Sequence, residues 1–356
     1  MRVLYRADGS PNIGTGHIIR GLILRRRLAA VGAHVTFLTR DLPWGVEKLR
    51  DAGCDALVIP PDADAEAECD ALRDAVRTLS PDVCVMDVLE TSEAQTCAVR
   101  DLDTRLVCLD DVGCGRLNAD AIVNILEVEP TPDAVAERGI ALYEGPGYAP
   151  LPEEYAEPGI AEREIPHKVR RIVITLGGAD PMGLAPKAAR AIKLAFESHR
   201  AGAAFEGPHV LLLIGSASGR RAEVMEAVRG REGAFTISAS VPSLLPVLRQ
   251  ADLGIVAGGL TTHEALAVGL PCIALCQAVR HQAELAQRFA DRGALISLGG
   301  GSEAKEARIA EAVLDLARDL DLRRRLAARG PQLVDGRGAE RTVEAIRQAA
   351  IGQRDR

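Results

Sequence analysis

The chain opens with MRVLYRADGSPNIGTGHIIRGLILRRRLAAV (residues 1–31), and this stretch decides the class of fold. Residues 2–6 form a short apolar run typical of a strand, and a loop containing three glycines follows it. Apolar residues at helical spacing then predict a helix over about 17–31. A strand that passes through a glycine loop into a helix is the opening of a βαβ unit, so the stretch predicts an α/β fold with a parallel sheet.

The same alternation of strand and helix runs through the rest of the chain. In the first half, the predicted helices include residues 64–79 and 92–102. Two helices are predicted to close the chain, over 303–320 and about 340–350. Further short apolar runs predict strands at 34–38, 56–59, 83–86, 106–109, 121–125, 171–176, 210–214, 235–237, 253–256, 272–275 and 295–298. The pattern predicts two similar, doubly wound Rossmann-like domains.

A proline-rich stretch divides the two series. Five prolines between residues 143 and 168 interrupt any helix or central strand there. We therefore expect a first domain over 1–148, a linker over 149–168 and a second domain over 169–356, with the last helix allowed to cross back to the first domain. Ligands of open α/β sheets bind at the carboxyl ends of the strands, so we expect the site in a cleft between these domains.

Composition excludes several classes of function. The 356 residues carry a formal net charge of −7 and only ten aromatic side chains, which argues against a nucleic-acid partner. The sequence shows neither an apolar run long enough to span a membrane nor a signal peptide. None of the eight cysteines forms a C-x-x-C pair, so we expect free thiols in a reducing compartment and no zinc site. A soluble, cytoplasmic protein is the expectation.

The first glycine loop, residues 8–17, brings a histidine to the start of a helix. It resembles a dinucleotide fingerprint, but Ile19 stands where the third glycine is required. A helix N-terminus disfavours the imidazolium form, so a neutral His17 would be ready to accept a proton near pH 7. The alternative is a histidine that only caps the helix. The flanking Gly14 and Gly16, which allow a ligand to approach the backbone, favour a functional role.

The second loop, residues 176–181, follows the first strand of the second domain. It contains Gly177 and Gly178, then Asp180 as the expected N-cap of a helix with Pro181 at its first position. The free N–H groups of such a helix start bind anions, and phosphates above all.

The third loop, residues 256–266, has two interpretations. In one, Thr261 caps a helix and Glu264 reaches back to form a capping box. In the other, phosphate binds at Gly258 and Gly259, and Glu264 accepts hydrogen bonds from a ribose diol. Two glycine loops after strands of one domain favour nucleotide binding.

Three aspartates follow predicted strands of the first domain. Asp8 could orient His17, bind a sugar hydroxyl or cap a turn. Asp110 and Asp111 suggest a metal site, but two adjacent carboxylates at one strand end are more often loop caps.

Taken together, these segments resemble a known family. The two Rossmann-like domains and the glycine loops of the second resemble the GT-B glycosyltransferase superfamily. The opening motif resembles the UDP-sugar hydrolase of pseudaminic acid biosynthesis and its spore-coat polysaccharide relatives (PseG/SpsG-like); it reads Arg6-x-Asp8-x-Ser10-x-x-Ile13-Gly14-x-Gly16-His17-x-x-Arg20. Matches continue at residues 85–87, 109–111, 123–124, 147–151, 176–180 and 257–266, so the resemblance covers nearly the whole chain.

The resemblance implies hydrolysis of a UDP-linked 2,4-diacetamido-2,4,6-trideoxyhexose to UDP and free sugar, with inversion at C1. His17 would be the general base for water, and the second domain would hold UDP without a metal or another cofactor. The substrate-binding residues that it implies are Arg6, Asp8, Gly14, Gly16, Arg20, Asp87, Tyr148, Gly177, Gly178, Asp180, Gly258, Gly259, Leu260, Thr261, His263 and Glu264. The alternatives are a GT-B glycosyltransferase with a carbohydrate or lipid acceptor, and a sugar-nucleotide-binding protein without turnover.

The chain departs from the family pattern at three places. Val88 and Leu89 stand where the family often has an aromatic residue, Pro152 where an arginine is common, and His263 where asparagine is frequent. The first and third departures would face the sugar.

Overall fold

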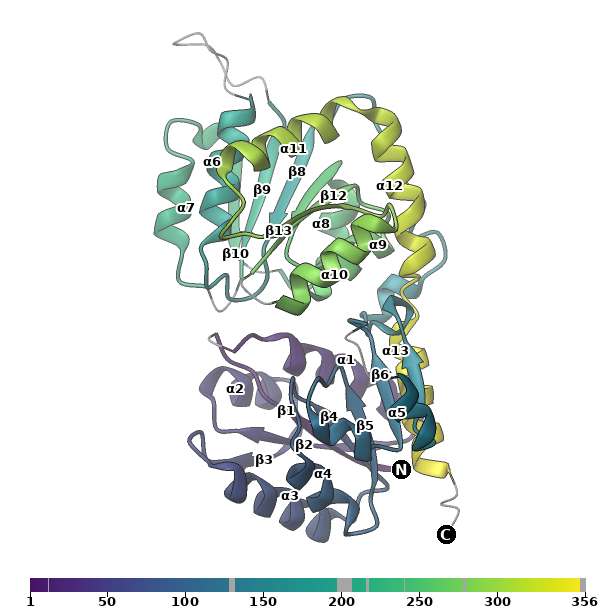
Figure 1. The fold of residues 1–356 in the computed structure, drawn as a ribbon. Coiled ribbons are helices and arrows are strands. Elements are labelled where there is room, and N and C mark those ends of the chain that lie inside the picture. Colours follow the sequence, from purple (N-terminus) through teal and green to yellow (C-terminus); the bar gives the residue numbers. More distant parts are fainter. Residues whose placement is uncertain are drawn as a thin grey trace. The chain divides into compact units, whose positions relative to one another are not determined.

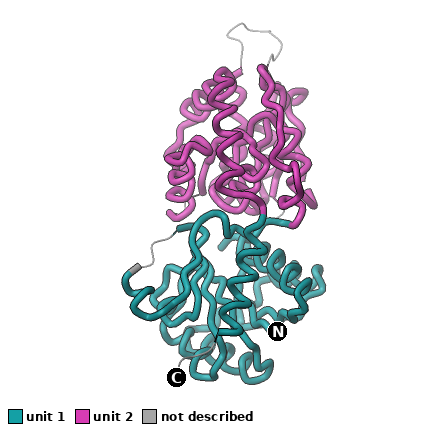
Figure 2. The backbone as a smooth tube through the Cα atoms, turned by 90° about the vertical axis from the view of Figure 1, so that its right-hand side faces the viewer, with its two compact units in different colours: residues 1–152, 337–356 teal, residues 153–336 magenta. Residues whose placement is uncertain are grey.

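The structure is a computed structural model that describes residues 1–11, 13–127, 132–196, 207–215, 218–239, 241–277 and 280–352. The chain divides into two compact units (Figure 2). Unit 1 comprises Met1–Pro152 and Arg337–Arg356, and unit 2 comprises Glu153–Gly336. The stretch 153–168, expected to be a linker, is thus counted with unit 2, and the last helix lies in unit 1.

Unit 1 is a parallel sheet with helices on both faces (Figure 1). The strand order is β3-β2-β1-β4-β5-β6-β7, and every neighbouring pair is parallel. The strands are β1 (Arg2–Ala7), β2 (His34–Arg40), β3 (Asp55–Ile59), β4 (Val83–Asp87), β5 (Arg105–Leu109), β6 (Ala121–Asn124) and β7 (Ala141–Glu144). The helices are α1 (Gly16–Ala30), α2 (Pro43–Asp51), α3 (Ala65–Leu79), α4 (Glu93–Arg100), α5 (Pro132–Glu137) and α13 (Gly338–Ile351), with 3-10 turns η1 (Cys114–Asn118) and η2 (Pro146–Tyr148).

Alternate strand residues of unit 1 enter two separate cores. Tyr5 and Val85 belong to the core with α1 and α13, whereas Leu4 and Met86 belong to the core with α3 and α4. This is the period of two that a strand imposes on its side chains. It matters for the site, because consecutive residues at a strand end are directed to opposite faces of the sheet.

Unit 2 repeats the same architecture with six parallel strands in the order β10-β9-β8-β11-β12-β13. Its strands are β8 (Arg171–Thr175), β9 (His209–Ile214), β10 (Phe235–Ala239), β11 (Leu253–Val256), β12 (Cys272–Cys276) and β13 (Ile296–Gly300). Its helices are α6 (Leu184–Phe196), α7 (Arg221–Ala227), α8 (Leu245–Gln250), α9 (Leu260–Ala267), α10 (Arg280–Asp291), α11 (Glu306–Arg318) and α12 (Leu320–Leu333), with 3-10 turns η3 (Glu153–Ala156) and η4 (Glu232–Ala234).

The structure confirms the predicted fold class and every predicted strand, and it adds elements for which no range was predicted, among them β7 and α12. Strand β7 lies at the edge of its sheet and is partly exposed, so it lacks the apolar run that marks the others. Helix α12 is a third closing helix, and it lies between the two whose ranges were predicted. Pro331 lies in the last turn of α12, where the remaining helix is short.

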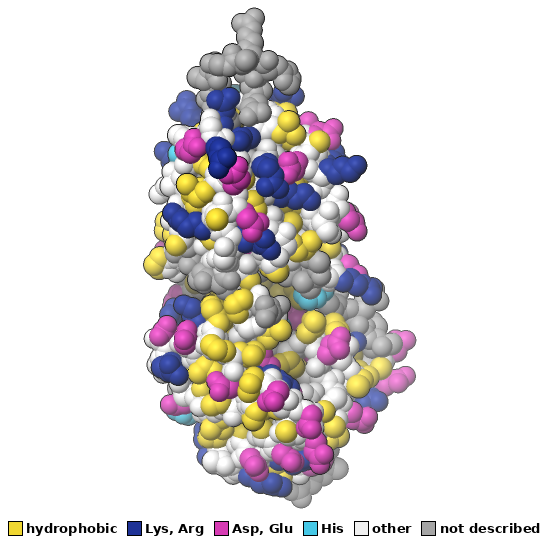
Figure 3. Space-filling view, turned by 90° about the vertical axis from the view of Figure 1, so that its left-hand side faces the viewer, with side chains coloured by type: hydrophobic (Ala, Val, Ile, Leu, Met, Phe, Trp, Pro, Cys, Tyr) yellow, Lys and Arg dark blue, Asp and Glu magenta, His cyan; other side chains and the backbone are white. Residues whose placement is uncertain are grey.

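Charge on the molecular surface is mixed. On the face drawn in Figure 3, acidic and basic side chains of the described residues are interspersed, without a continuous basic stripe. Within the described ranges, no helix combines the length and the apolar character that crossing a membrane requires.

Candidate active site

Each sheet has one point where the strand order reverses, and the candidate residues gather there. In unit 1 the reversal lies between β1 and β4, and in unit 2 it lies between β8 and β11. The loops that leave two such neighbouring strands run in opposite directions, which opens a crevice at their carboxyl ends. Asp87 ends β4, and the glycine pairs 177–178 and 258–259 follow β8 and β11.

The loop after β1 places His17 at the second position of α1. Ser10 and Gly14 exchange backbone hydrogen bonds of 3.0 and 2.9 Å, which closes the loop, and Gly14 has a φ of +98° that favours glycine. A Cβ at Gly16, the first residue of α1, would meet no atom within 4 Å. Asn12 of this loop lies outside the described residues. The approach to His17 along the backbone is therefore open.

His17 does not cap the helix but forms a pair with Asp87. Its Nδ1 lies 2.6 Å from Oδ1 of Asp87, which is fully buried, whereas 30% of the His17 side chain is exposed. Burial alone would raise the pKa of the Asp87 carboxyl, but Arg20 and His17 outweigh burial and hold this pKa well below its usual range. An ionised Asp87 only accepts hydrogen bonds, so Nδ1 of His17 carries a hydrogen; in the neutral imidazole, the lone pair is then on Nε2. Among the described residues, Nε2 has no hydrogen-bond partner.

Two further side chains, those of Arg20 and Tyr5, hold Asp87. The Arg20 guanidinium donates to both Asp87 oxygens, from Nε to Oδ2 at 3.0 Å, and also pairs with Asp110. The Tyr5 hydroxyl donates to Asp87 Oδ2 at 2.6 Å. Because Tyr5 and Arg20 are buried, this network fixes the carboxylate under the His17 ring.

Arg6 and Asp8 belong to a different cluster. Arg6 donates to Asp8 at 2.5 and 2.7 Å and to Glu68 at 3.0 and 2.7 Å, and it is 1% exposed. The Arg40 backbone N–H donates to Asp8 at 2.8 Å. Strand periodicity directs Arg6 to the α3 face, opposite to Tyr5. Asp8 makes no contact with His17 among the described residues; the side chain that orients His17 is Asp87.

Two other expectations in unit 1 concern Tyr148 and the aspartates after β5. Tyr148 packs beside Tyr143, with ring centroids 5.8 Å apart, and its carbonyl accepts from Thr342 of α13. Asp110 accepts from the Leu126 N–H at 2.9 Å, and Asp111 from Thr91 and Gly113 N–H groups at 2.9 and 2.7 Å, so both cap loops. No group of three metal-binding side chains occurs in the part of the chain that is described.

The two residues at the family's aromatic position differ in environment. Val88 packs against the core on the α3 side, whereas Leu89 is 38% exposed.

In unit 2, the loop after β8 is shaped by its aspartate. Gly177 has a φ of +88° and Asp180 one of +43°. Asp180 accepts from the Leu184 and Ala185 N–H groups at 2.8 and 2.9 Å and from Gln277 at 3.0 Å. Asp180 thus caps α6, but the helix begins at Leu184 and not at Pro181, because the left-handed turn at Asp180 delays it. The capping carboxylate is buried and occupied. The backbone of Gly177 and Gly178 lies close to Gly215, where an added Cβ would be 2.3 Å from both of their carbonyl oxygens.

In the loop after β11, Gly258 is packed closely against neighbouring residues, whereas Gly259 has open space beside its Cα. A Cβ at Gly258 would lie 2.5 Å from the Cys276 Sγ, whereas one at Gly259 would meet nothing within 4 Å. Gly259 precedes α9 without a side-chain cap, and Leu260 and Thr261 form the first turn. The capping-box interpretation is therefore wrong: Thr261 lies inside the helix and Glu264 has another partner.

That partner is Tyr155, whose hydroxyl donates to Oε1 of Glu264 at 3.1 Å. Burial raises the pKa of the Glu264 carboxyl to about 7; the Tyr155 hydrogen bond opposes this and the Glu154 charge adds to it. In contrast, His263 is directed inward. It is 1% exposed, lies edge-on to Phe289 and has its Nδ1 3.2 Å from the Gly259 carbonyl oxygen.

Sequence reasoning missed the side chains that hold the site residues: Tyr5, Tyr155 and Gln277. Only for Tyr5 could the sequence have predicted this role. Its position two residues before the end of β1 directs its side chain to the face of the sheet that α1 covers. Tyr155 and Gln277 contact partners about a hundred positions away, so the sequence gives no sign of these contacts.

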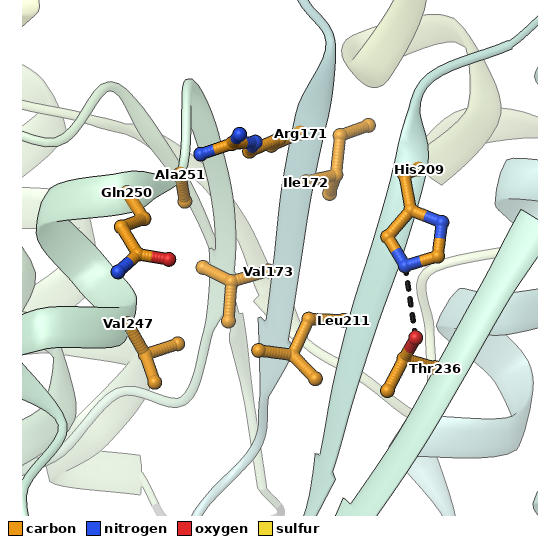
Figure 4. A pocket seen from close by; sticks show the side chains of 9 residues that line it. All are labelled: Arg171, Ile172, Val173, His209, Leu211, Thr236, Val247, Gln250 and Ala251. Carbon is orange, nitrogen blue, oxygen red and sulfur yellow. Dashed lines mark hydrogen bonds between the residues drawn. The ribbon is translucent and has the colours of Figure 1, made fainter.

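A cavity of about 240 Å³ in unit 2 lies elsewhere (Figure 4). It opens over the first residues of β8 and β9, where His209 lies 2.9 Å from the Thr236 hydroxyl. The glycine loops follow the carboxyl ends of the strands, so this cavity is not part of the candidate site.

Comparison with known proteins finds a relative that matches the chain over nearly its whole length. The spore coat polysaccharide biosynthesis protein SpsG of Bacillus subtilis (strain 168) is 27% identical, covering 98% of each chain. The chain is thus similar to SpsG over nearly its whole length. No family model matches it.

Solved structures confirm the fold of two Rossmann-like units. Acinetobacter baumannii MurG superposes with a TM-score of 0.71 at 14% identity, covering 98% of this chain and 99% of MurG. S. aureus MnaA, in a co-structure with UDP, superposes with a TM-score of 0.63 at 12% identity, covering 98% and 96%.

Proposed function

We propose that this protein hydrolyses a UDP-linked amino-deoxy sugar, of the UDP-2,4-diacetamido-2,4,6-trideoxyhexose type, to UDP and free sugar with inversion at C1. The observation that carries the proposal is the His17–Asp87 pair, in which Nδ1 contacts the carboxylate and Nε2 has no hydrogen-bond partner among the described residues. The resemblance of the opening motif, residues 6–20, to the pseudaminic acid hydrolase supports the choice of sugar.

In the proposed reaction, a water molecule attacks C1 of the sugar while His17 Nε2 takes one of its protons. The C1–O bond breaks, and UDP leaves with the bonding electron pair. The imidazolium that forms remains hydrogen-bonded through Nδ1 to Asp87, whose ionised carboxylate stabilises the new charge. Attack on the face opposite to UDP gives inversion.

The nucleotide half of the proposal rests on unit 2. Backbone N–H groups of the two glycine loops would bind the diphosphate without help from a positive net charge, and a Cβ at Gly259 would meet no atom within 4 Å. Glu264 is placed one turn into α9, with Oε2 free of protein partners among the described residues, and would accept from the ribose hydroxyls. The structural likeness to MnaA, which was solved with UDP, supports this assignment.

The test is to incubate the purified protein with the UDP-sugar in the absence of any acceptor and to follow UDP and free sugar. The proposal expects stoichiometric release of both, and a loss of at least about 100-fold in turnover for His17→Ala with UDP affinity retained. His34→Ala is the matched control, because His34 is an exposed histidine paired with Asp55.

Other results would contradict the proposal. Turnover that requires a carbohydrate or lipid acceptor would identify a glycosyltransferase instead. Binding of the UDP-sugar without turnover would identify a sugar-nucleotide-binding protein. A large loss of UDP affinity in His17→Ala would contradict the assignment of UDP binding to unit 2.

A further inference from the structure

The 3-10 turn η3 lies at the start of unit 2 and is anchored on both sides. Ser243, just before α8, donates from its hydroxyl to Glu154 at 2.5 Å. The chain leaves unit 2 at Gly336, whose φ of +78° brings its backbone against this turn: a Cβ at Gly336 would lie 2.0 Å from the Tyr155 carbonyl oxygen. The backbone of Tyr155 is therefore confined from two directions.

The Tyr155 side chain is equally confined. It is completely buried, and its hydroxyl reaches Oε1 of Glu264 at 3.1 Å. Burial and the neighbouring Glu264 carboxylate both raise the pKa of the Tyr155 hydroxyl far above its ordinary range, so this hydroxyl stays protonated and donates.

We propose that Tyr155 is a positioning residue for the nucleotide: it holds Oε1 of Glu264 so that Oε2 is directed to the ribose diol. This inference rests on the proposed function. A free glutamate side chain loses conformational entropy when it binds a ligand, and the hydrogen bond from a rigid, buried phenol removes that loss in advance. Tyr155 itself does not touch the nucleotide in this role.

The experiment measures the dissociation constants of UDP and 2′-deoxy-UDP by calorimetry. Wild-type protein is compared with Tyr155→Phe, Glu264→Gln and the double variant. We expect wild type to prefer UDP by about tenfold, as one hydrogen bond to a carboxylate provides. Tyr155→Phe should lose most of this preference, and the double variant should bind no worse than Glu264→Gln alone, since both act through one carboxylate.

Two control variants distinguish the proposed positioning role of Tyr155 from a general effect of the substitution on the structure. Tyr143→Phe removes the hydroxyl that donates to Gln348 in unit 1 and should leave the preference unchanged. Glu264→Asp keeps the charge but shortens the side chain, so the carboxylate can no longer bond both the Tyr155 hydroxyl and the ribose. We expect its preference for UDP over 2′-deoxy-UDP to resemble that of Tyr155→Phe. It serves as the second test if Tyr155→Phe does not fold.

The inference is overturned if Tyr155→Phe keeps the preference for UDP, or if its effect adds in full to that of Glu264→Gln. Absence of UDP binding to the wild-type protein would instead refute the proposed function itself, which makes the two failures distinguishable.

Discussion

The Nδ1 atom of His17 lies 2.6 Å from Oδ1 of Asp87, which joins the start of α1 to the end of β4 across the switch point of the first sheet. This contact converts a histidine at a helix start into an oriented base. It depends on the buried Arg20, which keeps the carboxylate charged.

Asp87→Asn should reduce turnover by at least about 100-fold, because the neutral amide no longer stabilises the imidazolium. UDP affinity should be retained, since the nucleotide is assigned to unit 2. Asp110→Asn is the comparison: it also removes a carboxylate from Arg20 but does not contact His17. Equal loss of turnover in both variants, measured as UDP release, would show that Asp87 acts only through the fold.

Arg6→Met should lower stability, with little change in the KM for the UDP-sugar. It leaves the buried Glu68 and the largely buried Asp8 with only the more exposed Arg40 as a cation, at a cost of up to about 3 to 5 kcal/mol. Urea unfolding measures this loss, and Arg77→Met, which removes an exposed pair with Asp74, should cost at most about 0.5 kcal/mol. A raised KM for the UDP-sugar in an Arg6→Met protein of unchanged stability would show that Arg6 contributes to substrate binding after all.

Stability should respond to pH through Glu264. Its pKa is raised by burial from 4.5 to about 7, so the folded state holds the proton more tightly than the unfolded state. Stability is therefore lost as pH rises from about 4.5 through 7, by at most about 3 kcal/mol. Glu264→Gln removes this loss, so its advantage over wild type in unfolding free energy should grow from pH 5 to pH 8. An advantage independent of pH would contradict the assignment.

The two glycines before α9 should behave differently. Gly258→Ala places a Cβ against Cys276 and should cost about 1 to 3 kcal/mol of stability. Gly259→Ala should fold normally but bind UDP at least about tenfold more weakly, because the added methyl group occupies the diphosphate approach. Gly233→Ala, also in open space but in η4, is the control for calorimetry. Unchanged UDP affinity in Gly259→Ala would argue against this loop as the phosphate site.

Local signals predicted most of the fold because parallel strands buried on both faces form continuous apolar runs, as in β12. The same signals predicted the glycine loops and His17. They failed where a feature depends on position within the sheet, as for β7 at its edge, or on a turn conformation, as for the delayed start of α6.

The sequence by itself determined the two Rossmann-like folds, the loops at the strand ends and the residue types available for acid–base and phosphate chemistry. Only the tertiary structure decided which of these residues meet. It paired His17 with Asp87 rather than Asp8, turned Arg6 to the opposite face and joined Glu264 to Tyr155. The reason is physical: hydrogen bonds between side chains 70 to 109 positions apart depend on sheet order and on the faces of strands and helices, which local sequence patterns do not encode.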